Sequence, residues 1–308
     1  MVSSRFRKFS VATSLGMLII LLNGALVTNM DAGRGCGDDW PLCHGKFIPA
    51  YTLESFIEYT HRLTTGIEGL LVVGMFIASI VLFRRDKIAY KQPLVFASSS
   101  LFFTILQALM GAAAVKWPQS PWVMAIHFGI SLMAFASTLL LVFWAYRNKN
   151  GQAVEFSVPR SIFPRLLGLA VYIYVVIYLG AYIRHTDSGG GCLDWPLCNG
   201  KVIPDFEGAE TIVFIHRIGA VILSLAIAGV YLHIRRKSGA NGGLTPMARL
   251  SLILVLTQVL SGALLTLTIT NSNWFVFTNL LHNLIVSALF GVIMDMLVRS
   301  WRLREGAK

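Results

Sequence analysis

Long apolar segments dominate the pattern of hydrophobic and polar positions along this 308-residue chain. Runs of about 20 apolar residues, enough for a helix to cross roughly 30 Å of hydrocarbon, recur along it. The pattern predicts eight membrane-spanning helices, at residues 10–30, 56–82, 93–115, 121–146, 164–184, 210–234, 247–269 and 275–298. The expected fold class is therefore an all-α integral membrane protein.

The predicted helices form two copies of one pattern. His61 and His216 are 155 residues apart, and so are His127 and His282. Four helices per copy return the chain to its starting side, which predicts two tandem four-helix bundles (1–150 and 151–308) related by a pseudo-two-fold axis along the membrane normal. Because segment 10–30 belongs to the repeat and lacks a small-residue cleavage site, we interpret it as a retained helix and not a signal peptide. Cys36, Trp40-Pro41-Leu42-Cys43, Gly45-Lys46, Pro49 and His61-Arg62 recur as Cys192, Trp195-Pro196-Leu197-Cys198, Gly200-Lys201, Pro204 and His216-Arg217.

Composition and charge agree with a membrane location. The chain is 55% hydrophobic and 13% charged, with a mean hydropathy of +0.66. Of its 26 Lys and Arg residues, 19 fall in one set of termini and loops, which predicts cytoplasmic termini and outward-facing cysteine loops. The net charge of +11 is explained by this topology, because the basic residues flank helices. Nucleic-acid binding is therefore not expected.

The repeated histidines share one predicted depth. His61, His127, His216 and His282 each lie about six residues inside the outer end of a predicted helix, roughly 9 Å along the helix axis. Ligating groups inside a bilayer are costly and usually functional. Closed zinc sites need more ligands than two histidines per half, whereas a haem needs only axial ligands. We therefore predict two bis-histidine haem sites, without covalent attachment, because no Cys-x-x-Cys-His motif is present.

Other repeated residues surround these histidines. Arg62 and Arg217 could hold haem propionates or extend toward the interface, and the two readings are compatible. Two further echoes, Gly24-Ala25 with Gly180-Ala181 and Gln107/Gly111 with Gln258/Gly262, are interpreted as ordinary helix packing.

The four cysteines lie in the predicted outward loops, where disulfides can form. Cys192 and Cys198 are expected to form a structural disulfide. For Cys36 and Cys43, a disulfide and a thiol chemistry both stay open.

One position separates the two halves. Glu58 precedes His61 by three residues, on the same helical face, and corresponds to Val213 in the second copy. We interpret it as a proton acceptor or charge stabiliser in a reactive half, with an interfacial surface charge as the alternative. Glu68 lies deeper and could be a buried carboxylic acid.

Together, Glu58-x-x-His61-Arg62, His127, His216-Arg217, His282 and the paired loop cysteines resemble the haem A synthase family of bacterial membranes. The resemblance implies that His61 and His127 hold the substrate haem O, and that His216 and His282 ligate a haem b cofactor. It implies Glu58 as the catalytic residue in an oxidation of a ring methyl to a formyl group, through a hydroxymethyl and a hydrated aldehyde. Haem O synthase (a farnesyltransferase) and cytochrome oxidase assembly factors would be expected partners.

Two other classes of membrane protein would use some of these histidines and cysteines. A di-haem electron-transfer cytochrome linked to quinol would need the same four histidines but would leave its haems unchanged. A membrane thiol–disulfide oxidoreductase would use the cysteines but leaves the histidines unexplained. The sequence identifies no electron donor or acceptor.

Overall fold

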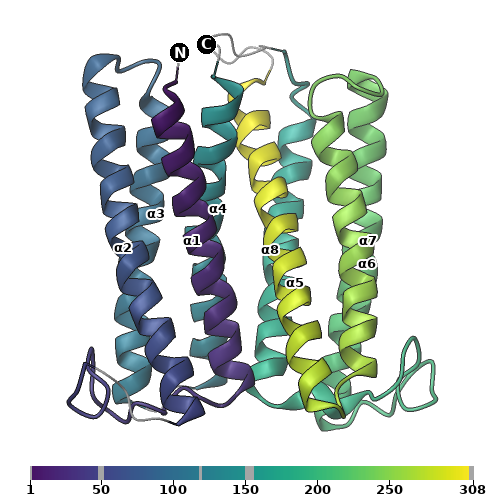
Figure 1. The fold of residues 1–308 in the computed structure, drawn as a ribbon. Coiled ribbons are helices and arrows are strands. Elements are labelled where there is room, and N and C mark those ends of the chain that lie inside the picture. The colour runs from purple at the N-terminus through teal and green to yellow at the C-terminus, as the bar shows by residue number, and fades with distance from the viewer. Residues whose placement is uncertain (1, 48–51, 118–119, 150–155, 305–308) are drawn as a thin grey trace. The chain divides into compact units, whose positions relative to one another are not determined.

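The computed structural model describes residues 2–47, 52–117, 120–149 and 156–304. These residues contain eight helices that are long and apolar enough to cross a membrane, with no strand among them, which confirms the predicted all-α class. The helices are α1 (Ser4–Asn29), α2 (Leu53–Arg85), α3 (Lys91–Lys116), α4 (Pro121–Arg147), α5 (Ile162–His185), α6 (Gly208–Ser238), α7 (Thr245–Leu267) and α8 (Ser272–Arg302) (Figure 1).

Several helices extend beyond the predicted apolar segments. The helix α2 has 33 residues, and α6 and α8 have 31 each. Thr52 caps α2 by accepting a hydrogen bond from the backbone N–H of Ser55, and basic residues occupy the last turn, where they complement the helix dipole. The apolar pattern ends at the first charged residues, whereas the hydrogen-bonded backbone continues past them.

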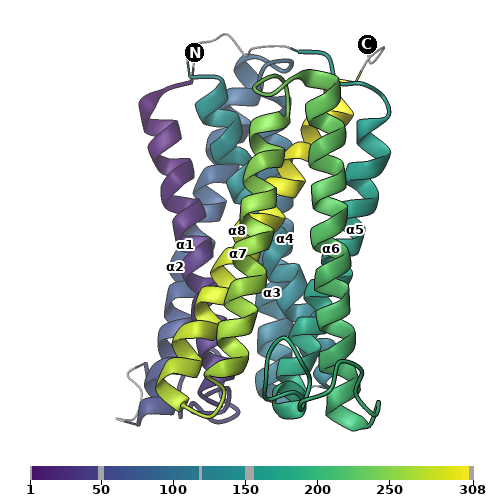
Figure 2. The same cartoon turned by 90° about the vertical axis from the view of Figure 1, so that its right-hand side faces the viewer.

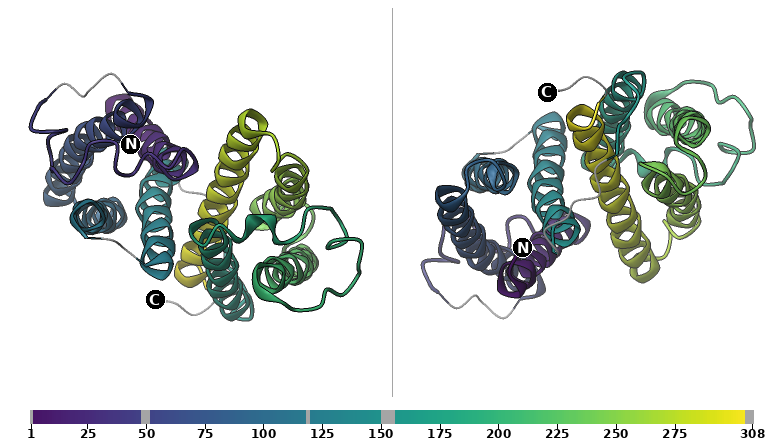
Figure 3. Two further views of the ribbon diagram at one scale, coloured as in Figure 1. Left: turned by 90° about the horizontal axis from the view of Figure 1, so that it is seen from below. Right: turned by 90° about the horizontal axis from the view of Figure 1, so that it is seen from above.

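The chain divides into two compact units. Unit 1 (Met1–Val154) contains α1–α4. Here α1 contacts α2 and α4, and α3 contacts the same two helices, so α2 and α4 lie across the bundle from each other (Figure 3). Its cysteine loop joins α1 to α2 at the end of the unit opposite the N-terminus (Figure 1).

Unit 2 (Glu155–Lys308) contains α5–α8. Its helices pack in the same order, with α6 and α8 on opposite sides of the bundle (Figures 2 and 3). A short 3-10 helix, η1 (Ser188–Gly191), lies in the cysteine loop and contacts α5 and α6. The backbone N–H of Val158 donates to the carbonyl of Leu303 at 2.7 Å, which ties the start of the unit to its last helix.

Some sequence predictions fall on residues outside the described ranges. These are the boundary at 150/151, Pro49 of the repeat and the basic residue Lys308. The axis that relates the two units stays a prediction.

Candidate haem-binding sites

The repeated histidines occupy matching places in the two units. His61 and His216 each lie eight residues after the first residue of their helices, α2 and α6. His127 lies six residues into α4 and His282 ten residues into α8. The prediction of about six residues therefore fits α4 only, because the other three helices begin further out than the apolar pattern indicated. All four side chains are partly buried.

Each histidine ring lies against a glycine of a neighbouring helix. A Cβ atom at that glycine would approach the Cε1 atom of the ring to between 3.0 and 3.9 Å. The interpretation of these repeated glycines as ordinary packing residues was incomplete, because they also provide the space that the imidazoles occupy. The pairs are Gly24 of α1 with His61, Gly111 of α3 with His127, Gly180 of α5 with His216 and Gly262 of α7 with His282.

The histidine-bearing helices face each other across each bundle. In unit 2, the rings of His216 and His282 lie close enough to interact electrostatically. In unit 1, His61 and His127 come from α2 and α4, which have the same diagonal relation. In each unit the two histidines therefore come from helices on opposite sides of the bundle, and helix bundles hold haem between side chains of such helices.

The donor set fits a haem iron better than a closed metal site. The described residues contain no group of three or more His, Cys, Asp or Glu side chains able to hold a metal ion. The buried Nδ1 atoms of His61 and His216 have no hydrogen-bond partner in the described structure. Buried polar atoms without partners are costly, so the protein alone leaves these rings under-satisfied at Nδ1, although His216 also hydrogen-bonds the backbone of Val176.

Two glutamines beside the histidines were not recognised as site residues from the sequence. Gln258 of α7 contacts Nε2 of His282 at 2.9 Å, and Ser261 contacts its Nδ1 at 2.9 Å. In unit 1, Gln107 donates to the backbone carbonyl of His127 and to the hydroxyl of Ser131. The repeated Gln/Gly spacing was the available signal.

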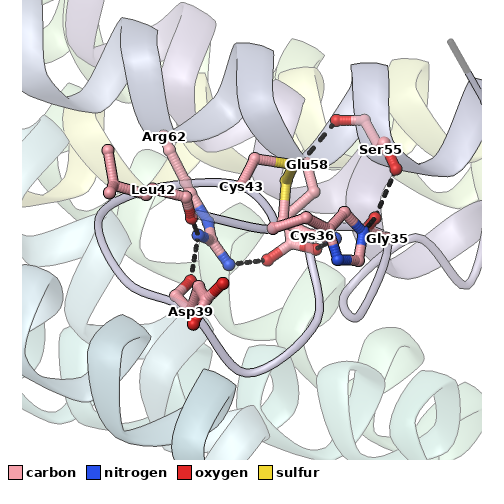
Figure 4. A network of polar contacts seen from close by, with 9 residues as sticks. Gly35, Cys36, Asp39, Leu42, Cys43, Ser55, Glu58 and Arg62 are labelled. Atoms are coloured by element: carbon pink, nitrogen blue, oxygen red, sulfur yellow. Dashed lines mark hydrogen bonds and ion pairs between the residues drawn. A yellow bond between two sulfur atoms is a disulfide. The ribbon is translucent and has the colours of Figure 1, made fainter. Parts of the chain in front are cut away.

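Glu58 lies in the interior of unit 1, beside the cysteine loop (Figure 4). The residue is 3% exposed, so its interpretation as an interfacial surface charge is wrong. Its Oε2 atom accepts a hydrogen bond from the backbone N–H of Cys36 at 2.8 Å, and its Oε1 atom pairs with Arg62. A carboxylate oxygen can accept more than one hydrogen bond, so both oxygens keep some acceptor capacity.

Arg62 connects Glu58 with the cysteine loop. Its Nη1 atom donates to the backbone carbonyls of Asp39 at 2.6 Å and Leu42 at 2.5 Å, while Nη2 contacts Glu58 (Figure 4). The Arg62 side chain is only 10% exposed, so it does not extend into solvent. Its Nε atom is buried without a hydrogen-bond partner in the described structure, which leaves one donor for an anionic ligand.

Unit 2 keeps the arginine contact without the carboxylate. Val213, at the position of Glu58, packs against the buried disulfide Cys192–Cys198. Arg217 donates through Nη1 to the carbonyl of Leu197 at 2.6 Å and through Nη2 to that of Cys192 at 3.2 Å. The contact with the loop leucine is therefore made in both units, whereas the described structure has a carboxylate at the Glu58 position in unit 1 only. In unit 2 another acidic residue, Glu210, contacts the loop at Asn199.

Both cysteine pairs form disulfides, Cys36–Cys43 in unit 1 and Cys192–Cys198 in unit 2. Each loop lies directly on the start of the following helix. A Cβ atom at Gly35 would overlap the backbone of α2 at Glu54, so only glycine allows this close approach. His44, which is exposed, contacts the carbonyl of Gly35 at 3.0 Å.

These features define an all-α membrane protein with two histidines on opposite helices in each of two four-helix units. Residues 50–294 match the model of the cytochrome oxidase assembly protein family, COX15-CtaA, and the chain belongs to this family.

Three relatives to which the chain is similar carry the same name. It is 38% identical over 295 residues to the haem A synthase of Shouchella clausii, covering 95% of this chain and 96% of that protein. It is 38% identical over 300 residues to the haem A synthase of Geobacillus kaustophilus (96% and 92% covered). It is 37% identical over 300 residues to that of Bacillus licheniformis (96% and 96% covered). The predicted family is confirmed.

Proposed function

We propose that this chain is a haem A synthase, an oxidoreductase that converts haem O to haem A within the membrane. One observation carries the proposal: among the described residues of two units with matching histidine pairs, only unit 1 has a buried carboxylate, Glu58, one helical turn before its first histidine. Family membership and the shared name of the relatives support it.

In this proposal unit 1 is the substrate site. His61 and His127 hold the iron of haem O from α2 and α4, and the Nε atom of Arg62 takes a propionate. Glu58 lies one helical turn from His61, toward the outer end of α2, where it can reach the edge of the ring. The methyl carbon gains one oxygen atom and gives up two electrons to become a hydroxymethyl, and does so again to become a hydrated aldehyde, which loses water to leave the formyl group. An oxidant from outside this chain takes the electrons.

Glu58 is the proton acceptor in these steps. Arg62 and the N–H of Cys36 hold the carboxylate in one orientation, so little reorganisation is needed when a proton leaves the substrate. The disulfide-bonded loop lies over this network and limits the access of water to it.

Unit 2 is the cofactor site in the proposal. His216 and His282 would hold a haem b, and Arg217 would contact one of its propionates. When bound, this haem would carry single electrons to or from the substrate site. Ser261 would orient the ring of His282 through Nδ1, and Nε2 would exchange its present contact with Gln258 for the iron.

The same proposal places the protein in a bacterial cell membrane. The termini are cytoplasmic and the cysteine loops extracytoplasmic, where disulfides persist. Haem O carries a farnesyl chain that partitions into lipid, so a substrate site between helices at bilayer depth suits it. Haem O synthase and cytochrome oxidase assembly factors are the proposed partners.

The test is the haem extracted from the purified protein after expression with a supply of haem O. We expect haem A, identified by its formyl group in the absorption and mass spectra. Recovery of haem b alone, together with rapid reduction by quinol, would instead identify a di-haem electron-transfer cytochrome. Histidine variants assign the units: His216→Ala should remove haem b, while His61→Ala should remove haem O and leave haem b bound.

A further inference from the structure

Glu68 is a second buried carboxyl group in unit 1, and the proposed chemistry does not use it. It lies on α2, seven residues deeper than His61, and is 2% exposed. Neither of its carboxyl oxygens has a hydrogen-bond partner in the described structure. Buried polar groups in a membrane protein are expensive and are kept mainly where they have a function.

The neighbouring helix is adapted to this side chain. Gly16 of α1 faces Glu68, and a Cβ atom at Gly16 would overlap the Oε2 atom of the carboxyl group. Any residue other than glycine would therefore displace the carboxyl group from its present place.

Unit 2 replaces both members of this pair. The position of Glu68 is taken by Leu223, and that of Gly16 by Tyr172. The Tyr172 hydroxyl donates to the carbonyl of Gly219 at 3.2 Å, and Leu223 is buried. A third buried polar residue of unit 1, Thr104, has Val255 as its counterpart. The two cores therefore differ in polarity at the depth of Glu68, below the histidines.

The two proposed ligands differ in a matching way. Haem O has a hydroxyl on the carbon that joins its farnesyl chain to the ring, and haem b has a vinyl group at that place. We propose that Glu68 hydrogen-bonds this hydroxyl and so makes unit 1 selective for haem O over haem b. This inference rests on the proposed function.

The geometry along α2 agrees with this role. Seven residues correspond to roughly 10 Å along the helix, so Glu68 lies about that far below the level of His61. A ring with its propionates toward Arg62 has its farnesyl-bearing edge on the deeper side, toward Glu68. A carboxyl group accepts from a hydroxyl in either protonation state.

Recognition of this kind gives strong selectivity. A site built to hydrogen-bond a hydroxyl leaves its own polar group unpaired when an analogue without that hydroxyl binds. Haem b in unit 1 would leave Glu68 without a partner, whereas in unit 2 it meets the apolar Leu223.

The inference is tested by titrating haem O and haem b into the purified protein whose unit 2 already carries haem b. The Soret band reports binding to unit 1, and the readout is the ratio of the two dissociation constants. Glu68→Leu, the residue of the other unit, should reduce the preference for haem O roughly tenfold, with haem b affinity unchanged. Glu68→Gln keeps an acceptor and should retain most of the preference.

Two further variants complete the experiment. Glu54→Leu removes an exposed acidic residue of the same helix and should leave the ratio unchanged. Gly16→Ala displaces the carboxyl group without removing it and should lower the ratio as Glu68→Leu does. Retention of haem b in unit 2 shows that each variant is folded.

Two results would overturn the inference: an unchanged ratio in Glu68→Leu, or an equal loss of affinity for both haems. The proposed function is judged separately, by haem A formation in the wild-type protein. Selective binding without product would refute the activity and leave the role of Glu68 standing.

Discussion

The contacts of Glu58 allow its chemical role to be separated from its structural role. Glu58→Ala removes the partner of Arg62 and the acceptor of the Cys36 N–H. Removing one member of a buried pair costs about 3–5 kcal/mol. Arg62 keeps two carbonyl partners in the loop, so we expect the lower end of that range, about 3 kcal/mol.

We expect this cost of about 3 kcal/mol to lower the local stability of the loop over residues 34–47. If it is expressed as local opening, the loop amides should exchange hydrogen roughly a hundredfold faster. Haem A formation should fall by about 10²- to 10⁴-fold, the usual contribution of a positioned base. Haem b in unit 2 should stay bound. The assays are hydrogen exchange of the loop and the rate of haem A formation from added haem O.

Glu58→Gln provides the decisive comparison. Its amide oxygen can accept from one of the two donors, so part of the loop protection should return, while the proton-accepting group is still absent. If this variant restores both loop protection and haem A formation, Glu58 is an anchor for the loop and not a base. Loss of all haem in Glu58→Ala would refute the assignment as well.

Three further predictions concern unit 2. Gly180→Val should displace the imidazole of His216, because the new Cβ would lie 3.0 Å from its Cε1 atom. The haem b content, measured by pyridine haemochrome assay, should fall at least about tenfold. The control Gly168→Val, in open space on the same helix, should leave the haem b content unchanged. Replacing the Cys192–Cys198 disulfide by serines should lower the free energy of unfolding by about 2 kcal/mol in denaturant titrations, the loop-closure value for so short a loop; full retention of stability would contradict this. The N–H groups of Gly200 and Asn199 hold the pKa of the Asp194 carboxyl below its usual value of 3.8, so the loop stability that it contributes is present at neutral pH and is lost as pH falls through this lowered pKa. The protection of the amides in this loop, corrected for the intrinsic exchange rate at each pH, should therefore fall in acid, and Asp194→Asn should remove that fall.

The helices and their histidines could be predicted because both depend on local pattern. Apolar run length determines where a chain crosses the bilayer, and the constant offset between His61 and His216 places them on equivalent helices. The helix ends were less accurate, since capped and charged turns extend beyond the apolar runs.

The network around Glu58 could not be predicted in the same way. Arg62 donates to the main-chain carbonyls of Asp39 and Leu42. Every residue has such a carbonyl, so the sequence does not indicate which ones the arginine contacts. The loop path that brings Cys36 over Glu58 depends on tertiary packing. The difference between Glu58 and Val213 was visible in the sequence, but its burial and partners were not.

Cys36 takes part in two features of unit 1. Its sulfur is bonded to Cys43 and its amide is bonded to Glu58, so one residue belongs to both the loop cross-link and the acidic network. Oxidation of the loop thus helps to place a contact of the carboxylate. Reduction of the Cys36–Cys43 disulfide should therefore loosen the Glu58 contact as well as the loop, because one residue takes part in both.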